Sequence, residues 1–417
     1  MALPVAFKDE LVARSDIVDV VSDYVTLTPK GGSFWGLCPF HGEKTPSFHV
    51  LPDRQLYHCF GCGKGGGVIS FVMDVENLPY IDAVRLLAKR AGMEVPEDGM
   101  DQGRQRQRSR LLALNKEAAR FFHSQLHSPV GQGGLQYLQN RGLSRGTMTR
   151  FGLGFAPDSW DSLIRAMAQK GFEKRDLLDA GLAVSNKKGG IYDRFRGRVI
   201  FPIIDLRGDV IGFGGRVLGD GTPKYLNSPD TPVFNKSRNL FALNLAKNTK
   251  QGRLLLTEGY MDTISLHQAG FDCAVASLGT SLTADHAKLL SRFTKEVILC
   301  YDGDTAGVQA ANRAIPMLEA AGIQVKVLRM HDAKDPDEFI KKFGAERFEM
   351  LLNGSNNAIE YELLQAKGKY DIATPDGRLN YIKDAIGVLA GRITPTERDV
   401  YAGRLAEETN ISKTAIL

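Results

Sequence analysis

Short apolar runs alternate with amphipathic segments between residues 251 and 340. Three of these runs, at 253–257, 297–301 and 323–329, have the length and composition of buried strands. The segments that follow the first two runs have the spacing of helices. This alternation predicts a parallel sheet with crossover helices.

The remaining parts of the chain show different patterns. Residues 1–98 contain short strand-like runs, three of the five cysteines and a dense cluster of glycines. The polar stretch that follows has no apolar periodicity, which predicts an exposed linker over 99–110, with a helix starting near Ser109. Short helices and strands rich in glycine and arginine are expected over 111–245. Residues 341–417 have the pattern of short amphipathic helices.

Composition and charge narrow the class of protein. The chain of 417 residues is 43% apolar and 24% charged, as in globular proteins, and no apolar run approaches the ~18 residues of a membrane span. Residues 111–250 carry 21 basic against 11 acidic residues, so most of the positive charge lies in the middle of the chain. A basic middle region indicates a polyanionic partner, although a merely solvated basic surface has the same composition.

Two closely spaced pairs of metal-ligand residues stand in the first segment. Cys38 and His41 are separated by two residues, and Cys59 and Cys62 repeat that spacing. Such pairs sit on turns that direct both side chains at one ion, and four protein ligands leave no position for water. The sequence therefore predicts one structural Zn²⁺. The aromatic residues around the ligands are expected mainly to form a small core.

Acidic residues follow the predicted strands of the parallel sheet. Glu258 comes directly after the first strand, and Asp302 and Asp304 follow the second. Strand ends of a parallel sheet meet at one edge, so these acids are expected to converge there. Clustered carboxylates suit Mg²⁺ or Mn²⁺. Each acid alone would more often be a helix N-cap, and that alternative stays open.

The residues around both motifs resemble those of the bacterial DnaG-type primases. Residues 38–48 and 57–63 are similar to the zinc-binding domain of that family. Residues 258–262 and 302–307 resemble the two halves of its Toprim motif. Further similar stretches are 194–202, 214–216, 224–229, 234–236 and 334–338.

The resemblance implies a DNA primase in the bacterial cytoplasm, at the replication fork. Such an enzyme is a nucleotidyltransferase that makes short RNA primers on single-stranded DNA from ribonucleoside triphosphates. Glu258, Asp302 and Asp304 would be catalytic and would hold two Mg²⁺ or Mn²⁺ ions. Second-tier candidates for metal or triphosphate are Asp262, Asp335 and Asp337. The residues expected to bind nucleic acid or nucleotide are Arg196, Arg198, Arg216, Lys224, Asn227 and Lys236.

The implied architecture is a multidomain α+β protein. A zinc ribbon over 1–98 is expected to contact the template, and the linker over 99–110 joins it to the polymerase domain. That domain would comprise a mixed α/β basic subdomain (111–245), a Toprim parallel-sheet core (246–340) and a C-terminal helical bundle (341–417).

The helicase-binding domain that usually follows in this family is expected to be absent. Asn410 is a plausible N-cap for a last helix, and the chain stops at Leu417 without a helix terminator. We therefore expect no contact with the replicative helicase through this chain.

Two other classes of function are weighed against the primase. A Toprim nuclease or topoisomerase would share the acids, and Tyr260 beside them is the tyrosine that a topoisomerase would use as its nucleophile. A non-catalytic single-strand-binding module would not need the acids at all.

Overall fold

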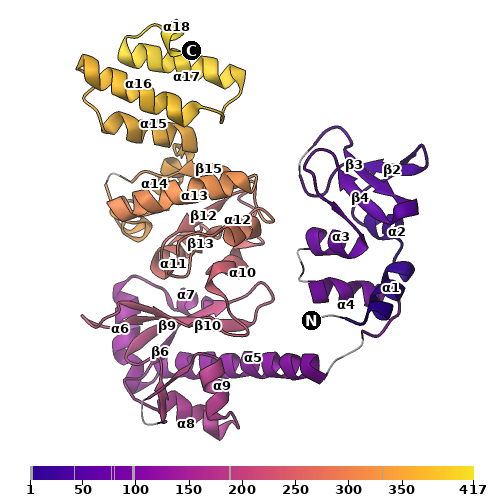
Figure 1. Ribbon diagram of the computed structural model, residues 1–417. Helices are drawn as coiled ribbons and strands as arrows, with labels where there is room; N and C mark the ends of the chain where they lie inside the picture. Colours follow the sequence, from indigo (N-terminus) through magenta and orange to yellow (C-terminus); the bar gives the residue numbers. More distant parts are fainter. Residues whose placement is uncertain are drawn as a thin grey trace. The chain divides into compact units, whose positions relative to one another are not determined.

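The computed structural model describes residues 3–41, 43–76, 78, 80–95, 99–186, 189–330 and 332–417. The chain folds into two compact units, residues 1–106 and 107–417 (Figure 1). The expected multidomain α+β class is confirmed. Within the described residues, no helix is both long and apolar enough to cross a bilayer.

The first unit is built on a five-stranded antiparallel meander. Its strands pair in chain order, so each strand lies beside the next. Buried residues alternate with half-exposed ones along the third strand, where Phe48 and Val50 face the core. The strands are β1 (Thr28–Lys30), β2 (Ser33–Gly36), β3 (Phe48–Leu51), β4 (Leu56–Cys59) and β5 (Gly65–Gly66).

Helices from both sides of the sheet sequence complete the core of the first unit. Asp16 caps the second of them by accepting hydrogen bonds from the backbone amides of Val18 and Asp19. The core joins Leu11 and Ile17 from the helices to Phe48 and Tyr57 from the sheet. The helices are α1 (Val5–Arg14), α2 (Ile17–Ser22), α3 (Val68–Val75) and α4 (Tyr80–Arg90).

A long helix, α5 (Gly99–Leu126), corrects the expected start of helical structure near Ser109. Residues 99–110, expected as a linker, are helical, and the boundary between the two units falls inside the helix at Arg106 and Gln107. Residues 103–106 are all exposed, so this part of the helix has no buried face that would require apolar residues at regular spacing. A helix without an apolar face gives no signal in the hydrophobic pattern.

The second unit begins with an antiparallel sheet of order β11-β10-β9-β6. Its longest strands, β9 (Arg198–Ile204) and β10 (Val210–Val217), pair with each other and are buried over most of their length. The other elements are β6 (Gly154–Ala156), β7 (Ala183–Ser185), β8 (Ile191–Asp193), β11 (Tyr225–Asn227), α6 (Gln132–Asn140), α7 (Arg145–Arg150), α8 (Ser162–Gln169), α9 (Lys174–Asp179) and α10 (Leu243–Ala246).

A parallel sheet of order β13-β12-β14-β15 follows, as the alternating pattern predicted. A short antiparallel strand, β16 (Asn356–Asn357), extends its edge. Helix α11 packs against α14, and α12 packs against α13 (Figure 1). The strands are β12 (Leu254–Thr257), β13 (Ala274–Ala276), β14 (Glu296–Leu299) and β15 (Gln324–Val327), and the helices are α11 (Tyr260–Gln268), α12 (Ala284–Leu290), α13 (Thr305–Ala320) and α14 (Pro336–Asn353).

The chain closes with a helical bundle around Leu363, Tyr381 and Leu405. Asn410 is not the N-cap of the last helix: it ends the preceding helix in the left-handed conformation, with φ of 56°, and Ser412 is the N-cap. Asparagine suits both positions, which explains the difference. The helices are α15 (Ala358–Gly368), α16 (Pro375–Leu389), α17 (Pro395–Thr409) and α18 (Lys413–Ile416).

Candidate functional site

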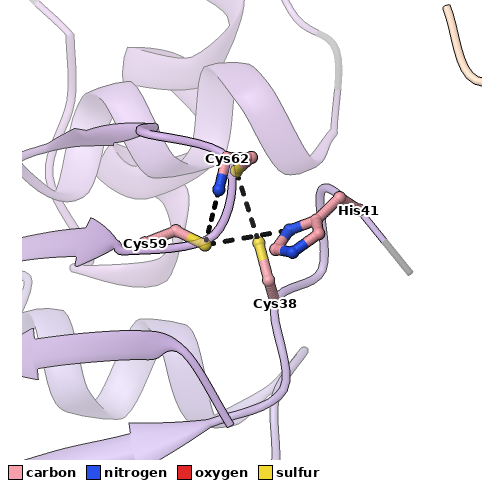
Figure 2. A group of neighbouring side chains, drawn as sticks. All are labelled: Cys38, His41, Cys59 and Cys62. Carbon is pink, nitrogen blue, oxygen red and sulfur yellow. Dashed lines mark hydrogen bonds between the residues drawn. The ribbon is translucent and has the colours of Figure 1, made fainter. Parts of the chain in front are cut away.

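The four predicted zinc ligands converge in the first unit (Figure 2). The ligand atoms of Cys38, His41, Cys59 and Cys62 all lie within 4.8 Å of one another. The Sγ atoms of Cys38 and Cys62 are 3.8 Å apart, and the Sγ of Cys59 lies 3.7 Å from Nδ1 of His41. A tetrahedron with Zn–S bonds of about 2.3 Å has S···S edges of about 3.8 Å, so the set fits Zn²⁺.

Two tight turns hold these ligands in place. The amide of Phe40 donates to the Sγ of Cys38, and the amide of Cys62 donates to the Sγ of Cys59, each at 3.4 Å. Gly61 allows the second turn to approach the first, because a Cβ there would lie 2.5 Å from Nε2 of His41. Gly63 continues the turn with φ of 72°, a conformation that favours glycine.

The sequence analysis missed Glu43, which lies at the centre of this site. Its carboxylate accepts hydrogen bonds from the amide of Cys38 at 2.7 Å and from the amide and hydroxyl of Ser47. One carboxylate oxygen is also 3.3 Å from Nε2 of His41. A carboxylate two residues after a predicted histidine ligand is the signal that would have indicated it.

The predicted acids lie at the carboxyl edge of the parallel sheet. Glu258 follows β12, and Asp302 and Asp304 follow β14, which pairs directly with β12. The Glu258 carboxylate accepts a hydrogen bond from the amide of Asp302 at 3.2 Å. Gly307 is needed beside them, because a Cβ at this position would collide with the carbonyl oxygen of Asp302.

The acids are less compact than the zinc ligands. Of the residues that the structure describes, only the Cys38 group brings three or more ligand atoms within 4.8 Å of one another. Asp304 also caps α13 by accepting from the amide of Gly307 at 2.9 Å, and Asp335 caps α14. The helix-cap role therefore applies to two of the predicted acids, and it leaves their second carboxylate oxygens available.

Burial, and then the neighbouring negative charges, raise the pKa values of this group. Burial raises the pKa of Glu258, and the neighbouring Asp302 raises it further. Burial, Asp335 and Asp304 likewise raise the pKa of Asp302. Asp262 is affected most, because burial, Asp335 and Asp302 raise its pKa to about 7. Such a cluster favours a bound cation, and carboxylate oxygens are the ligands that Mg²⁺ and Mn²⁺ prefer.

Cationic side chains face these acids across a cleft of about 300 Å³. Arg141, Arg216 and Lys224 line the cleft together with Glu258 and Asp302. The guanidinium of Arg216 donates to the hydroxyl of Tyr225 at 2.8 Å and lies over the rings of Tyr137 and Tyr225. Arg141 was missed by the sequence analysis, because nothing in the pattern of its helix distinguishes it from other exposed arginines.

Asp337 is placed differently from the other acids. Its side chain is only 4% exposed and forms ion pairs with Arg141 and Lys341, with a further hydrogen bond from Ser265. A carboxylate with these partners has a structural role in joining α14 to the helix α6 region. Its expected role in binding metal or triphosphate stays a prediction.

Arg198 and Asn227 also serve the framework. Arg198 is buried, and its Nη1 donates to the carbonyl oxygens of Gly215, Pro223 and Lys224. The amide of Asn227 donates to the carbonyl of Leu278 and accepts from the hydroxyl of Tyr260, each at 2.8 Å. Both residues therefore position the cleft, and their polar groups are engaged inside the protein.

The remaining predicted residues of the basic subdomain are closer to solvent. Arg196 lies over the rings of Trp160 and Tyr192, with its Cζ atom 4.3 Å and 5.1 Å from the ring centroids. Trp160 is 66% exposed, so this arginine lies at an accessible surface. Lys236 begins a short 3₁₀ turn, and its backbone carbonyl oxygen accepts a hydrogen bond from the ring of buried His286.

Tyr260 does not have the environment of a nucleophile. It is buried, stacks on Phe201 with ring centroids 4.8 Å apart, and donates its hydroxyl proton to Asn227. Burial raises the pKa of this phenol well above its usual range. This removes the tyrosine on which the topoisomerase alternative depended.

Together, a zinc ribbon and a basic subdomain joined to an acid-bearing parallel sheet define a nucleic-acid enzyme with a Toprim-like centre. Comparison with protein families agrees with this class. Residues 3–103 match the CHC2 zinc finger, 121–247 the N-terminal domain of the DNA primase catalytic core, and 255–340 the Toprim-like family.

Individual relatives make the assignment specific. The chain is 44% identical over 406 residues to the DNA primase of Clostridium acetobutylicum, covering 96% of this chain and 67% of the relative. It is 45% identical over 387 residues to the DNA primase of Escherichia coli K12, covering 90% and 66%. The chain therefore belongs to the DnaG family of DNA primases, as the motifs indicated, and spans about two thirds of the length of these curated relatives.

Solved structures agree. The zinc-binding and RNA polymerase domains of the Aquifex aeolicus primase match with a TM-score of 0.61 at 35% identity, covering 100% of this chain and 99% of that one. A DnaG primase catalytic domain bound to single-stranded DNA matches with a TM-score of 0.63 at 40% identity, covering 75% and 99%.

The family comparison does not support the expected absence of a helicase-binding region. Residues 359–414 match the family described as the DnaB-helicase binding domain of primase. This segment is most of the helical bundle, from α15 to α18. Its helices carry no distinctive motif, so the sequence analysis assigned them only as amphipathic helices.

Proposed function

We propose that this chain synthesises short RNA primers on single-stranded DNA from ribonucleoside triphosphates. The observation that carries the proposal is the cleft in which Arg141, Arg216 and Lys224 face Glu258 and Asp302. A site for a nucleoside triphosphate needs cationic side chains that bind the phosphates and carboxylates that bind the metal ions.

The acids are the proposed holders of two divalent ions. Glu258 and Asp302 would bind one Mg²⁺ or Mn²⁺, and Asp302 and Asp304 the second. When bound, these ions neutralise the phosphates and stabilise the charge of the attacking and leaving oxygens. Asp262 belongs to the same acidic group, since burial and the charges of Asp335 and Asp302 raise its pKa.

The cations have the complementary role of orienting the triphosphate. Arg216 is held between two tyrosines, so its planar guanidinium is already ordered before a ligand arrives. Arg141 is fixed by its ion pair with Asp337, and Lys224 is exposed at the rim. Ordered donors lose little conformational entropy on binding phosphate, and bidentate guanidinium groups bind it well.

The zinc ribbon is the proposed contact for unpaired template bases. Trp35, His49 and Phe60 lie side by side in stacked geometry, with ring centroids 4.4 Å apart for Trp35 and His49. Phe60 is 65% exposed, and Lys30 lies near the ring of Trp35. Aromatic faces with adjacent cations bind single strands by stacking and phosphate contact. This face differs from the buried aromatics Phe48, Tyr57 and Phe71, which form the core as expected.

The decisive experiment is incorporation of labelled ribonucleotides on a single-stranded DNA template without a primer. Template-dependent RNA products that require Mg²⁺ or Mn²⁺ are expected. Cleavage or relaxation of the DNA would instead indicate a Toprim nuclease or topoisomerase. Binding without any product would indicate a non-catalytic binding module.

A second proposed function is contact with the replicative helicase through residues 359–414. The match of this segment to a helicase-binding family supports the proposal. Leu379 and Ile386 on α16 are 51% and 41% exposed, and their spacing of seven residues places them on one face of the helix. An exposed apolar face of this kind suits a protein partner.

A further inference from the structure

Glu43 connects three of the four zinc-ligand residues through one carboxylate. One oxygen accepts from the amide of Cys38 at 2.7 Å and from the amide of Ser47 at 3.1 Å. The other accepts from the Ser47 hydroxyl and lies 3.3 Å from Nε2 of His41. The Ser47 hydroxyl oxygen is in turn 3.3 Å from the Sγ of Cys59.

The orientation of His41 follows from this arrangement. Its Nδ1 points to the sulfur atoms, 3.7 Å from the Sγ of Cys59 (Figure 2). Nε2 lies on the side of the Glu43 carboxylate, at 3.3 Å. Gly61 packs directly against the ring, because a Cβ there would lie 2.5 Å from Nε2. The imidazole therefore lies between a glycine and a carboxylate that is only 11% exposed.

We propose that Glu43 is the residue that positions the zinc site, by fixing His41 as an Nδ1 ligand whose Nε2–H is donated to the carboxylate. A carboxylate that accepts from a metal-bound histidine sets its tautomer and increases its basicity. Through Ser47, the same group orders the turn that carries Cys59. Glu43 thus links the two ligand pairs, although 17 residues lie between His41 and Cys59 in the chain.

An amide cannot replace this carboxylate. Glu43 faces four donors, the two backbone amides, the Ser47 hydroxyl and the His41 ring. Glutamine has one acceptor oxygen, and its NH₂ group would be directed at donors. Loss of such a partner of a zinc ligand typically costs 10- to 100-fold in metal affinity.

The test compares zinc release from the full chain to a chromogenic chelator. Glu43→Gln is expected to release zinc at least about tenfold faster than the parent. Ser47→Ala is expected to show a smaller acceleration, because it removes only the hydroxyl link to Cys59. Glu10→Gln is the matched control, since Glu10 pairs only with exposed Arg14 among the contacts of the described residues, and its release rate should equal the parent's.

A second measurement does not depend on the variants folding. In the full chain labelled with ¹⁵N-histidine, the zinc-dependent histidine signal should show a metal-bound Nδ1 and a protonated Nε2. A metal-bound Nε2 would overturn the proposal. Release from Glu43→Gln at the parental rate would also overturn it.

Discussion

Nη1 of Arg198 donates a hydrogen bond to the carbonyl oxygen of Pro223 at 2.9 Å, inside the protein. The same nitrogen lies within hydrogen-bonding distance of the carbonyls of Gly215 and Lys224. Arg198 is only 7% exposed. Its guanidinium therefore stabilises the turn that carries Lys224 at the cleft. Arg196, two residues earlier, lies instead beside exposed Trp160.

The two arginines should therefore differ sharply when replaced by alanine. Arg198→Ala removes buried hydrogen bonds and is expected to destabilise the protein by about 2–4 kcal/mol. It should raise the KM for ribonucleoside triphosphates more than it lowers kcat, because Lys224 loses its fixed position. Thermal unfolding and steady-state primer synthesis measure the two effects.

Arg196→Ala should lower stability less than Arg198→Ala does, because Arg196 is more exposed, and should weaken binding to all single-stranded sequences about equally. Phosphate contacts carry little sequence information. A titration over several salt concentrations should show a slope flatter by roughly 0.7. Equal stability losses in the two variants would contradict the distinction drawn between them.

Asp302→Asn should abolish primer synthesis while leaving single-strand binding intact. Asp302 lies between Glu258 and the other acids, so its neutralisation removes a proposed ligand of both divalent ions. Removing a negative charge does not weaken attraction to a polyanion. Glu346→Gln makes the same change of charge at an exposed position of α14 and should retain parental activity. Synthesis by Asp302→Asn within a few-fold of the parent would exclude the role.

Some of these features could be predicted from the sequence because they depend on spacing alone. Two ligand pairs on tight turns, and acids at the ends of strands 254–257 and 296–299, follow from local pattern. Arg198 could not be separated from Arg196 in this way. Its burial depends on a partner strand, where Gly215 leaves room: a Cβ at Gly215 would lie 3.1 Å from Cδ of Arg198. A contact between residues on two paired strands cannot be predicted from the local sequence of either strand.

Zinc content should depend on Cys59 and be independent of Cys273 and Cys300. Cys59→Ser removes one of four converging ligands, and metal analysis is expected to show loss of the single zinc ion. Cys273 is buried beside the parallel sheet, where its thiol donates to Gln251, so Cys273→Ser should retain one zinc per chain. Undiminished zinc in Cys59→Ser would show that the ligand set is wrong.

Buried His267 should make the protein acid-sensitive. Burial lowers its pKa to about 4 from an ordinary 6.5, while Nε2 donates to the carbonyl of Ala274 at 2.8 Å. The unfolded chain then binds a proton at higher pH than the folded one. The stability contribution is complete above pH 6.5 and is lost progressively as the pH falls to about 4, by about 3 kcal/mol.

Denaturant titrations at several pH values measure this dependence. His267→Gln should flatten the decline between pH 6.5 and 4. A variant at exposed His58 should keep the parental slope. An unchanged slope in His267→Gln would show that other groups cause the acid sensitivity.

The helicase proposal predicts that the exposed face of α16 governs binding. Serine at both Leu379 and Ile386 removes the apolar contact surface without touching the core, so folding should be preserved. Affinity for the cognate hexameric helicase, and any helicase-dependent increase in primer yield, should fall by tenfold or more. Met350→Ser is the control, because Met350 is 73% exposed but lies outside residues 359–414. Parental binding by the double variant would place the contact elsewhere in the segment, and no binding by the parent chain would exclude a contact through 359–414 alone.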